Sequence, residues 1–335
     1  MPGLGVNAGP LLSGSGATIG REFWDTYSQK FEGEKKFVDM VSNPDIPSKV
    51  KNQPEGYFET SAYPVIWLDG DDIASKPFSS VQFVIYNRSW GRRIPYSEDD
   101  LVYEQTGSLL AKVREAAGHW NTLDARILIQ FMTAATDPDL VPGTILAPDG
   151  AAMYATTAGG ANRFGVSNGN SISGDYMDSA ATVLDGIQAA INQATQFLDT
   201  EGQPLLDPTV FMEMVIAWPA AYATVFQQAM AQTTTSIGPN TGTSNAGVTN
   251  YILNSGRIIH AWITPRLTAK AFYVFFPRVN KQAFGKAVVT PLREAYADMT
   301  NDPTARSSKQ FYNQWDMRFG PYLGPCFSTV KVTDS

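Results

Sequence analysis

The stretch FVIYNRSWGRRIPYSEDD, residues 83–100, joins three different local patterns without a linker. It begins as a β-strand, with Phe83 and Ile85 on the same face. It continues through a bulky basic corner, WGRR at 90–93, and ends on SEDD at 97–100, a strong helix start. The stretch therefore predicts a long strand tied through two arginines to a capped helix, and none of its residues indicates catalysis.

The helix that follows is predicted to be long and amphipathic. Ser97 and Asp100 resemble a capping box, and acidic residues fill the first turns, where the helix dipole favours anions. From Leu109 to Phe131, apolar residues recur every three or four positions and form one stripe. We expect a single spine helix over 97–135, which Gly118 could interrupt.

A β-hairpin is predicted directly before this helix. The β-rich segments AYPVIWL (62–68) and VQFVIYN (81–87) are joined by DGDDIASKPFSS, which contains two turn-forming pairs. An isolated hairpin is marginally stable in water, so its aromatic side chains need a partner surface. The hairpin either packs on its own domain or reaches a neighbouring molecule. The aromatic residues concerned are Trp67, Phe83 and Tyr86.

The remainder of the chain alternates helical and strand patterns, which predicts an α+β fold. Residues 209–218 are nearly continuous in apolar side chains and predict a buried central strand, with a helix starting at Pro219. The other expected elements are a flexible arm over 1–20, short helices over 20–42, a long structured loop over 148–174, an amphipathic helix over 180–198, strands over 257–263 and 270–276, a short helix over 291–299, and terminal strands over 310–332.

The composition bounds the function. The 335-residue chain is 43% hydrophobic, enough for a substantial core, but only 17% charged, against roughly 25% in ordinary soluble domains. Its net charge is −7 and it has no run of Lys or Arg that could grip phosphates. This argues against a sequence-reading nucleic-acid binder, but is compatible with a shell that encloses nucleic acid without gripping it.

The sequence offers little catalytic chemistry. Its two histidines, His119 and His260, are far apart in the chain, and Cys326 is the only cysteine, which excludes a His/Cys metal cluster and an intrachain disulfide. GSGATIG (14–20) lacks the strand and the Lys-Ser/Thr ending of a phosphate loop. The most apolar stretch, 211–226, is interrupted and too short to span a bilayer. We expect no catalytic residue, no cofactor, no metal and no membrane association.

Four segments carry a resemblance to a known family. They are YPVIWLDGDD, FVIYNRSWGRRIPYSEDDLVYEQTG, APDGAAMYATTAGGANRFG and LLDPTVFMEMVIAWPAAYATVF. They resemble the Mu-like prophage major head subunit family, and the order of elements looks like the HK97-like major capsid fold of tailed bacteriophages. The resemblance implies an N-terminal arm with short helices (1–56), an extended hairpin loop (57–96), a peripheral domain (97–139 and 276–335) and a mixed α/β axial domain (140–275).

The resemblance also implies a function. It is that of a major capsid protein whose copies assemble as hexamers and pentamers into an icosahedral shell around double-stranded DNA. The implied partners are copies of the chain itself, a scaffold, a portal and decoration proteins, and the implied locations are the virion capsid and, during assembly, the host cytoplasm. The alternatives are a nanocompartment shell of the same fold with a protein cargo, and an α/β enzyme with a cryptic carboxylate site.

In this family the extended loop overlaps the next subunit, so the hairpin and the basic corner become the candidate contact region. Arginine guanidinium groups form planar, multi-donor contacts with carboxylates, and the acidic turn of an adjacent hairpin would supply such groups. The residues expected to make intersubunit contacts are Trp67, Asp69, Asp71, Asp72, Phe83, Tyr86, Arg92 and Arg93.

Overall fold

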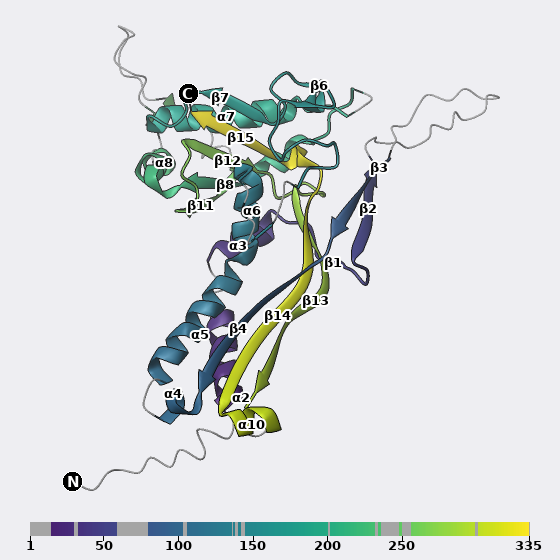
Figure 1. Cartoon of the computed structure of the whole chain (residues 1–335). Helices are drawn as coiled ribbons and strands as arrows, with labels where there is room; N and C mark the ends of the chain where they lie inside the picture. The colour runs from purple at the N-terminus through teal and green to yellow at the C-terminus, as the bar shows by residue number, and fades with distance from the viewer. Residues whose placement is uncertain are drawn as a thin grey trace, which may run out of the picture.

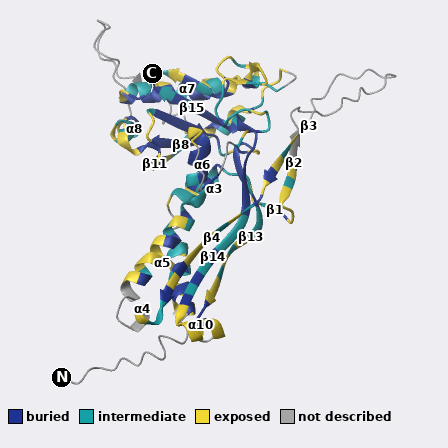
Figure 2. Cartoon of the chain, viewed as in Figure 1, coloured by how far each residue is buried: buried dark blue, intermediate teal, exposed yellow. Residues whose placement is uncertain are grey.

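A computed structural model describes most of the chain. Figure 1 shows a broad upper part built on one sheet and a long, narrow lower part, in which helices run along a second sheet. Buried residues concentrate in the upper part and between the helices and the second sheet (Figure 2). The described residues are 15–29, 33–58, 80–102, 106–135, 137, 140–141, 145–199, 202–231, 234–235, 248–249, 256–298 and 301–334.

The upper sheet has five strands in the order β11-β8-β12-β15-β7. Side chains of β8, an interior strand between β11 and β12, alternate between two cores: Ile216 and Trp218 pack on one face, and Val215 on the other. Because both faces are covered, the strand is apolar at nearly every position, and the predicted buried strand is confirmed. The strands are β7 (Ser171–Gly174), β8 (Glu213–Pro219), β11 (Ile258–Thr264), β12 (Ala271–Phe275) and β15 (Thr329–Asp334).

Two helices cover one face of this sheet. α7 (Ala180–Thr195) begins at a capping box formed by Ser179 and Thr182, and its apolar stripe packs into the same core as α8 (Ala223–Ala231). The helices predicted over 180–198 and after Pro219 are thereby confirmed. Short two-residue strands occupy the connecting segments: β5 (Thr157–Ala158), β6 (Ala161–Asn162), β9 (Thr234–Thr235) and β10 (Val248–Thr249).

The second sheet has four strands in the order β1-β13-β14-β4. The prediction of a short helix over 291–299 is wrong, because β13 continues through Ala297, paired with β14. Leucine, glutamate and alanine favour a helix locally, but this long-range pairing overrides the preference. The strands are β1 (Ile46–Pro47), β4 (Arg88–Ser97), β13 (Phe284–Ala297) and β14 (Gln310–Leu323). The short helix α10 (Pro303–Ser308) lies between β13 and β14.

The end of the chain is divided between the two sheets. β14 belongs to the lower sheet, but β15 pairs antiparallel with β12 and parallel with β7 in the upper one. The sequence analysis placed both strands together in residues 276–335, and for β15 that placement is corrected. Its side chains Val330 and Val332 complete the core under α7, which is the physical reason for the crossover.

Over the predicted spine helix the structure describes α4 (Glu98–Val102), α5 (Thr106–Asn121) and α6 (Leu123–Thr133), and residues 103–105 lie outside the described residues. The break between α5 and α6 lies at Thr122, not at Gly118. The Thr122 hydroxyl donates to the carbonyl of Gly118 at 3.2 Å, a back-bond that bends helices. The amide of Arg126 still donates to the Thr122 carbonyl at 3.0 Å, so the two helices remain nearly in line (Figure 1).

The predicted cap at the start of α4 is confirmed. The Ser97 amide donates to Asp100 Oδ2 at 2.8 Å, and the Asp100 amide donates to Ser97 Oγ at 3.3 Å. The hydrogen bonds from Ser97 lower the pKa of the Asp100 carboxyl below its usual value. The capped turn therefore keeps its charge at neutral pH and fixes the angle between β4 and the helix.

The N-terminal helix starts earlier than expected. α2 (Ser15–Gln29) takes up the last part of the predicted arm, and residues 1–14 lie outside the described residues. Ile19 and Phe23 are buried, and the Phe23 ring stacks on Trp315 of β14 with 4.3 Å between ring centroids. The helix α3 (Glu34–Met40) follows and packs near α6, so the helices predicted over 20–42 are confirmed.

We expect Gly20→Leu to lower the free energy of unfolding by about 1–3 kcal/mol, the usual range for overpacking. A Cβ at Gly20 would lie 2.1 Å from Glu294 Oε1, and Trp24 and Asn313 hold that carboxylate in place through hydrogen bonds. Urea denaturation of the unassembled protein measures the change, with Ala17→Leu on the exposed side of α2 as control. Equal stability of the two variants would show that α2 does not pack on β13 in this way.

Candidate assembly surface

The hairpin is built from strands other than the expected pair. β3 (Ser80–Tyr86) confirms the second predicted strand, but it pairs antiparallel with β2 (Asn52–Phe58), in the register Asn52↔Tyr86 to Phe58↔Ser80. The predicted first strand, 62–68, lies outside the described residues. Residues 52–58 are not recognisable as a strand from the sequence, because the proline and glycine in NQPEGYF weaken a strand pattern.

The root of the hairpin packs on its own chain. Ile85 is 1% exposed, and the half-buried Phe83 ring lies 5.6 Å from the Tyr322 ring of β14. On the opposite face of β3, Val84 is 47% exposed and Tyr86 is 60% exposed. The hairpin is predicted either to pack on its own domain or to reach a neighbouring molecule. Each alternative applies to one face of β3: the Phe83 face is covered by the chain itself, and the Val84 face is exposed.

A hydrogen-bonded bend separates β3 from β4, where the sequence predicted one long strand. The Asn87 side-chain amide donates to Ser48 Oγ at 2.9 Å and to the Val50 carbonyl at 2.6 Å. Asn87 itself is buried. The bend thus fixes the direction in which β2 and β3 leave the lower sheet (Figure 1).

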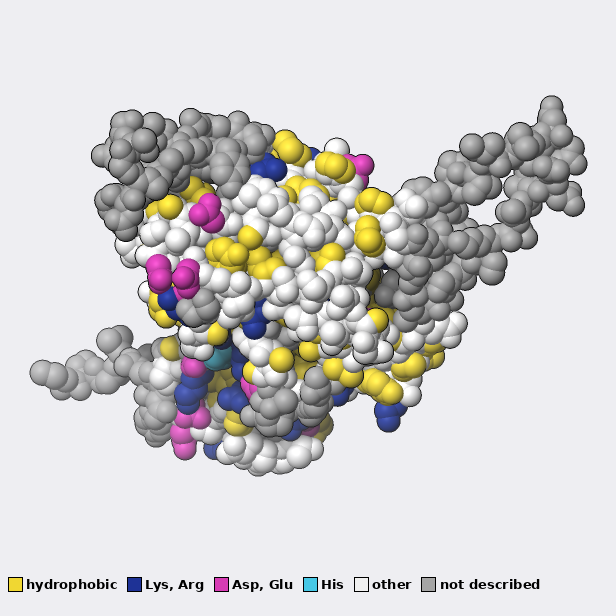
Figure 3. Space-filling view, turned by 90° about the horizontal axis from the view of Figure 1, so that it is seen from above, with side chains coloured by type: hydrophobic (Ala, Val, Ile, Leu, Met, Phe, Trp, Pro, Cys, Tyr) yellow, Lys and Arg dark blue, Asp and Glu magenta, His cyan; other side chains and the backbone are white. Residues whose placement is uncertain are grey.

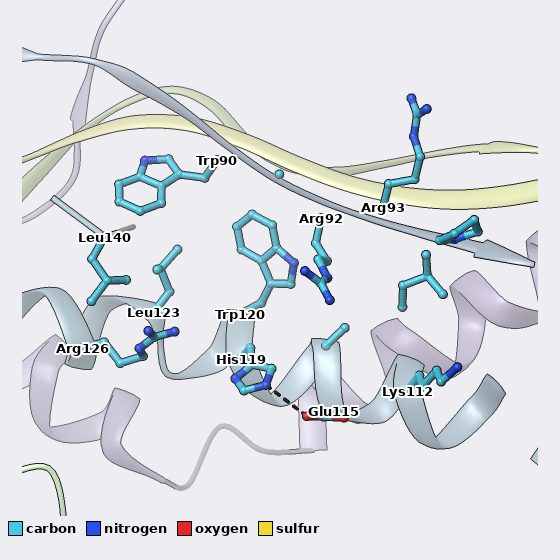
Figure 4. A pocket seen from close by; sticks show the side chains of 14 residues that line it. Trp90, Arg92, Arg93, Lys112, Glu115, His119, Trp120, Leu123, Arg126 and Leu140 are labelled. Carbon is cyan, nitrogen blue, oxygen red and sulfur yellow. Dashed lines mark ion pairs between the residues drawn. The ribbon is translucent and has the colours of Figure 1, made fainter. Parts of the chain in front are cut away.

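The two arginines of the basic corner differ in their contacts. Arg93 donates from Nη2 and Nε to Gln314 Oε1, at 2.8 and 3.1 Å, and its guanidinium lies 4.2 Å from the centre of the Tyr312 ring. Arg92 is exposed and makes no hydrogen bond or ion pair within the described part of the chain. Figure 4 shows Arg92 directed towards α5 and Arg93 directed away from it, as alternation along a strand requires.

A groove of about 750 Å³ lies between β4 and the helices α5 and α6. Arg92 and Lys112 both line this groove, and Lys112, like Arg92, has no hydrogen bond or ion pair among the described residues. Two further basic side chains of the groove do have acidic neighbours: His119 lies 3.5 Å from Glu115, and Arg126 lies 4.0 Å from Asp137. The groove residues that matter here are Trp90, Arg92, Lys112, His119, Trp120 and Arg126.

The predicted contact residues are thus only partly brought together. The structure places Arg92 in the groove, Arg93 and Phe83 against their own chain, and Tyr86 on the exposed face of β3. The remaining four, Trp67, Asp69, Asp71 and Asp72, lie outside the described residues. The sequence analysis missed Lys112, because a lysine on the outer side of a predicted helix looks like an ordinary solvated charge.

The polar clusters that could carry chemistry have structural explanations. On β11, His260 Nε2 lies 3.1 Å from Glu213 Oε1, and Arg278 binds the other Glu213 oxygen at 3.0 Å, so the three side chains form one polar network. Burial raises the pKa of the Cys326 thiol to about 11, so it stays protonated at neutral pH. Within the described ranges, no cluster of His, Cys, Asp or Glu is placed to hold a metal ion, and no helix could cross a membrane.

Comparison with solved structures places this arrangement in a known fold. No protein-family model and no curated protein matches the sequence. The capsid of an empty GTA particle matches with a TM-score of 0.52 at 11% identity, over 90% of both chains. The capsid of the native GTA particle matches with a TM-score of 0.52 at 10% identity, over 90% of this chain and 91% of the other. The capsid of the cyanophage P-SCSP1u gives 0.49 at 14% identity, over 89% and 88%. The expected α+β fold, the HK97-like capsid fold, is thereby confirmed.

Proposed function

We propose that this chain is the major capsid protein of a tailed bacteriophage or prophage. Its copies assemble as hexamers and pentamers into an icosahedral shell that encloses double-stranded DNA. The observation that carries the proposal is the agreement of the whole chain, 90% of both lengths, with the capsid of the empty GTA particle. The assignment to the Mu-like head subunits rests on the four sequence segments alone.

The surface supports an assembly role. A shell needs large heterologous contacts that close on themselves, and such contacts do not need a catalytic site. The exposed face of β3 offers apolar side chains, and the face seen from above is mostly uncharged with apolar side chains interspersed (Figure 3). The acidic balance of the chain suits a shell that does not clamp its DNA.

The finer assignments follow from the same proposal. Residues 57–96 are the extended loop that contacts the next subunit, 97–139 with 276–335 apart from β15 the peripheral domain, and 140–275 with β15 the axial domain. The loop and corner residues Trp67, Asp69, Asp71, Asp72, Tyr86 and Arg92 contribute to the contact, whereas Phe83 and Arg93 hold the loop and the corner on their own subunit. Scaffold, portal and decoration proteins are the expected partners, in the host cytoplasm during assembly and in the virion afterwards.

Purified full-length protein is expected to form closed shells or large capsomers. Size-exclusion chromatography followed by negative-stain electron microscopy of the same fractions tests this. Shells that hold DNA would support the capsid role, whereas shells that hold only a protein cargo would indicate a nanocompartment instead. A chain that stays monomeric or dimeric under all assembly conditions, with its scaffold present, would contradict the proposal.

A further inference from the structure

The groove between β4 and α5 presents two cations for which the described residues supply no ion-pair partner, beside the one carboxylate of its lining, Glu115. Arg92 and Lys112 make no hydrogen bond or ion pair among the described residues, although the chain carries a net charge of −7. Several other cations do find carboxylates: Arg163 with Asp149, Arg278 with Glu213, and Lys286 with Asp124. An Arg and a Lys that form no ion pair among the described residues, and that face one groove of an acidic protein, favour an anionic ligand.

The groove has an apolar end as well as a cationic end. Figure 4 shows Trp90, Leu123 and Leu140 grouped at one end and Arg92 with Lys112 towards the other, with Trp120 between them. Arg126, at the apolar end, lies near Asp137, so the free positive charge stays at the Arg92 end. A fitting ligand is therefore an extended peptide whose apolar side chains precede its carboxylates.

The chain contains a segment of that chemistry. Residues 65–72, VIWLDGDD, place four apolar side chains directly before three aspartates. We propose that the groove binds this segment of a second copy of the chain. The apolar half lies against Trp90 and Leu123, and the aspartates pair with Arg92 and Lys112. The proposal rests on the proposed function and names the receiving site of that contact.

The occupant comes from a second copy, because β3 and the groove lie on opposite faces of the lower sheet. β3, which follows the segment, packs through Phe83 and Ile85 on the face of the lower sheet that carries Tyr322. α5 packs with Trp315 of β14 into a separate core on the other face. Figure 1 likewise shows β2 and β3 on the side of this sheet away from α5. The groove of the same chain is therefore behind its own sheet.

The test is binding of a fluorescent peptide of residues 63–74 to the full-length protein, kept unassembled and followed by anisotropy. We expect saturable binding that weakens with salt, and a loss of about tenfold in affinity for the double variant Arg92→Glu, Lys112→Glu. Lys49→Glu with Lys51→Glu, which reverses two exposed cations outside the groove, should bind as the unchanged protein does. A peptide with all three aspartates replaced by lysine should bind the groove variant better than the unchanged protein.

Two results would overturn the inference. Equal affinity of the unchanged protein and the groove variant would place the peptide elsewhere, and no binding of the peptide would mean that another molecule fills the groove. Electron microscopy of the same proteins separates this inference from the shell proposal. Normal shells from both proteins, with no peptide binding by the unchanged protein, would contradict the inference alone, whereas groove-dependent peptide binding without any shells would contradict the shell proposal alone.

Discussion

Replacing residues 59–79 by a short Gly-Ser turn is expected to leave a folded subunit that forms no shells. The strands β2 and β3 and the three largest buried clusters all lie outside the removed segment. The subunit therefore keeps its core, while the apolar and acidic side chains that we assign to the neighbour contact are lost. Because each subunit would lose this contact, the effect on assembly is expected to be complete.

The extent of the excision provides a matched control. A longer excision, of residues 66–83, also removes Phe83 and its contact with Tyr322, so we expect that variant to melt at a lower temperature. Circular dichroism and thermal melting report folding, and electron microscopy reports shells. Unfolding of the shorter variant would place 59–79 in the subunit's own core, and normal shells from it would show that the hairpin is dispensable for assembly.

The elements predicted best from the sequence are those whose partners are close in the chain or whose pattern is unambiguous. The apolar stripe of α7 and its cap at Ser179 predict a helix. The continuous apolar run of β8 predicts a strand that is buried on both faces. β13 could not be recognised, because its second half contains helix formers and becomes a strand only through pairing with β14. The distant partner holds the information that the local sequence lacks.

The residues of the candidate assembly surface also fall into those that the sequence can predict and those that it cannot. Alternation along β4 could have separated Arg92 from Arg93, since neighbouring strand residues face opposite sides. That Arg93 meets Gln314 and Tyr312, while Arg92 meets a helix groove, depends on strand pairing far along the chain. Lys112 becomes a candidate only when α5 is laid beside β4, which no spacing in the sequence reveals.

Arg163 is the residue whose importance the sequence hides most completely. Its side chain is 1% exposed, and it lies in the segment 148–174, predicted as a long structured loop. The guanidinium donates from Nε and Nη2 to the two oxygens of Asp149, at 2.7 and 3.1 Å, and from Nη1 to the carbonyls of Ala152 and Met153, at 2.8 and 3.0 Å. One side chain thus satisfies a carboxylate and two backbone acceptors.

The network also ties this loop to the upper sheet. Arg163 Nη1 donates to Asn170 Oδ1 at 3.2 Å, and Asn170 Nδ2 donates to the carbonyls of Cys326 and Thr329, at 3.1 and 3.3 Å, where β15 begins. Asn170 is fully buried. Loss of the guanidinium would therefore disturb the loop and the edge of the sheet together, because their polar groups share one set of hydrogen bonds.

We expect Arg163→Met to lower the free energy of unfolding by about 3–5 kcal/mol, the range for removing one partner of a buried ion pair. Methionine fills a similar volume, so the loss reflects the unpaired Asp149 and the bare carbonyls rather than a cavity. Set against a total of about 5–15 kcal/mol for a typical domain, this is a large fraction of the stability. Urea denaturation of the unassembled protein measures it, with the exposed Arg21→Met as control, for which a change within about 0.5 kcal/mol is expected.

A double-mutant cycle isolates the ion pair from the other contacts. Asp149→Asn should cost less when Arg163 is already methionine than in the unchanged protein, because the carboxylate then has no guanidinium to lose. The free energy of unfolding of Arg163→Lys should lie between those of the unchanged protein and Arg163→Met, since a single ammonium cannot reproduce the forked contact. A loss for Arg163→Met no larger than that of Arg21→Met, or strict additivity with Asp149→Asn, would show that this buried pair does not hold the loop to the sheet.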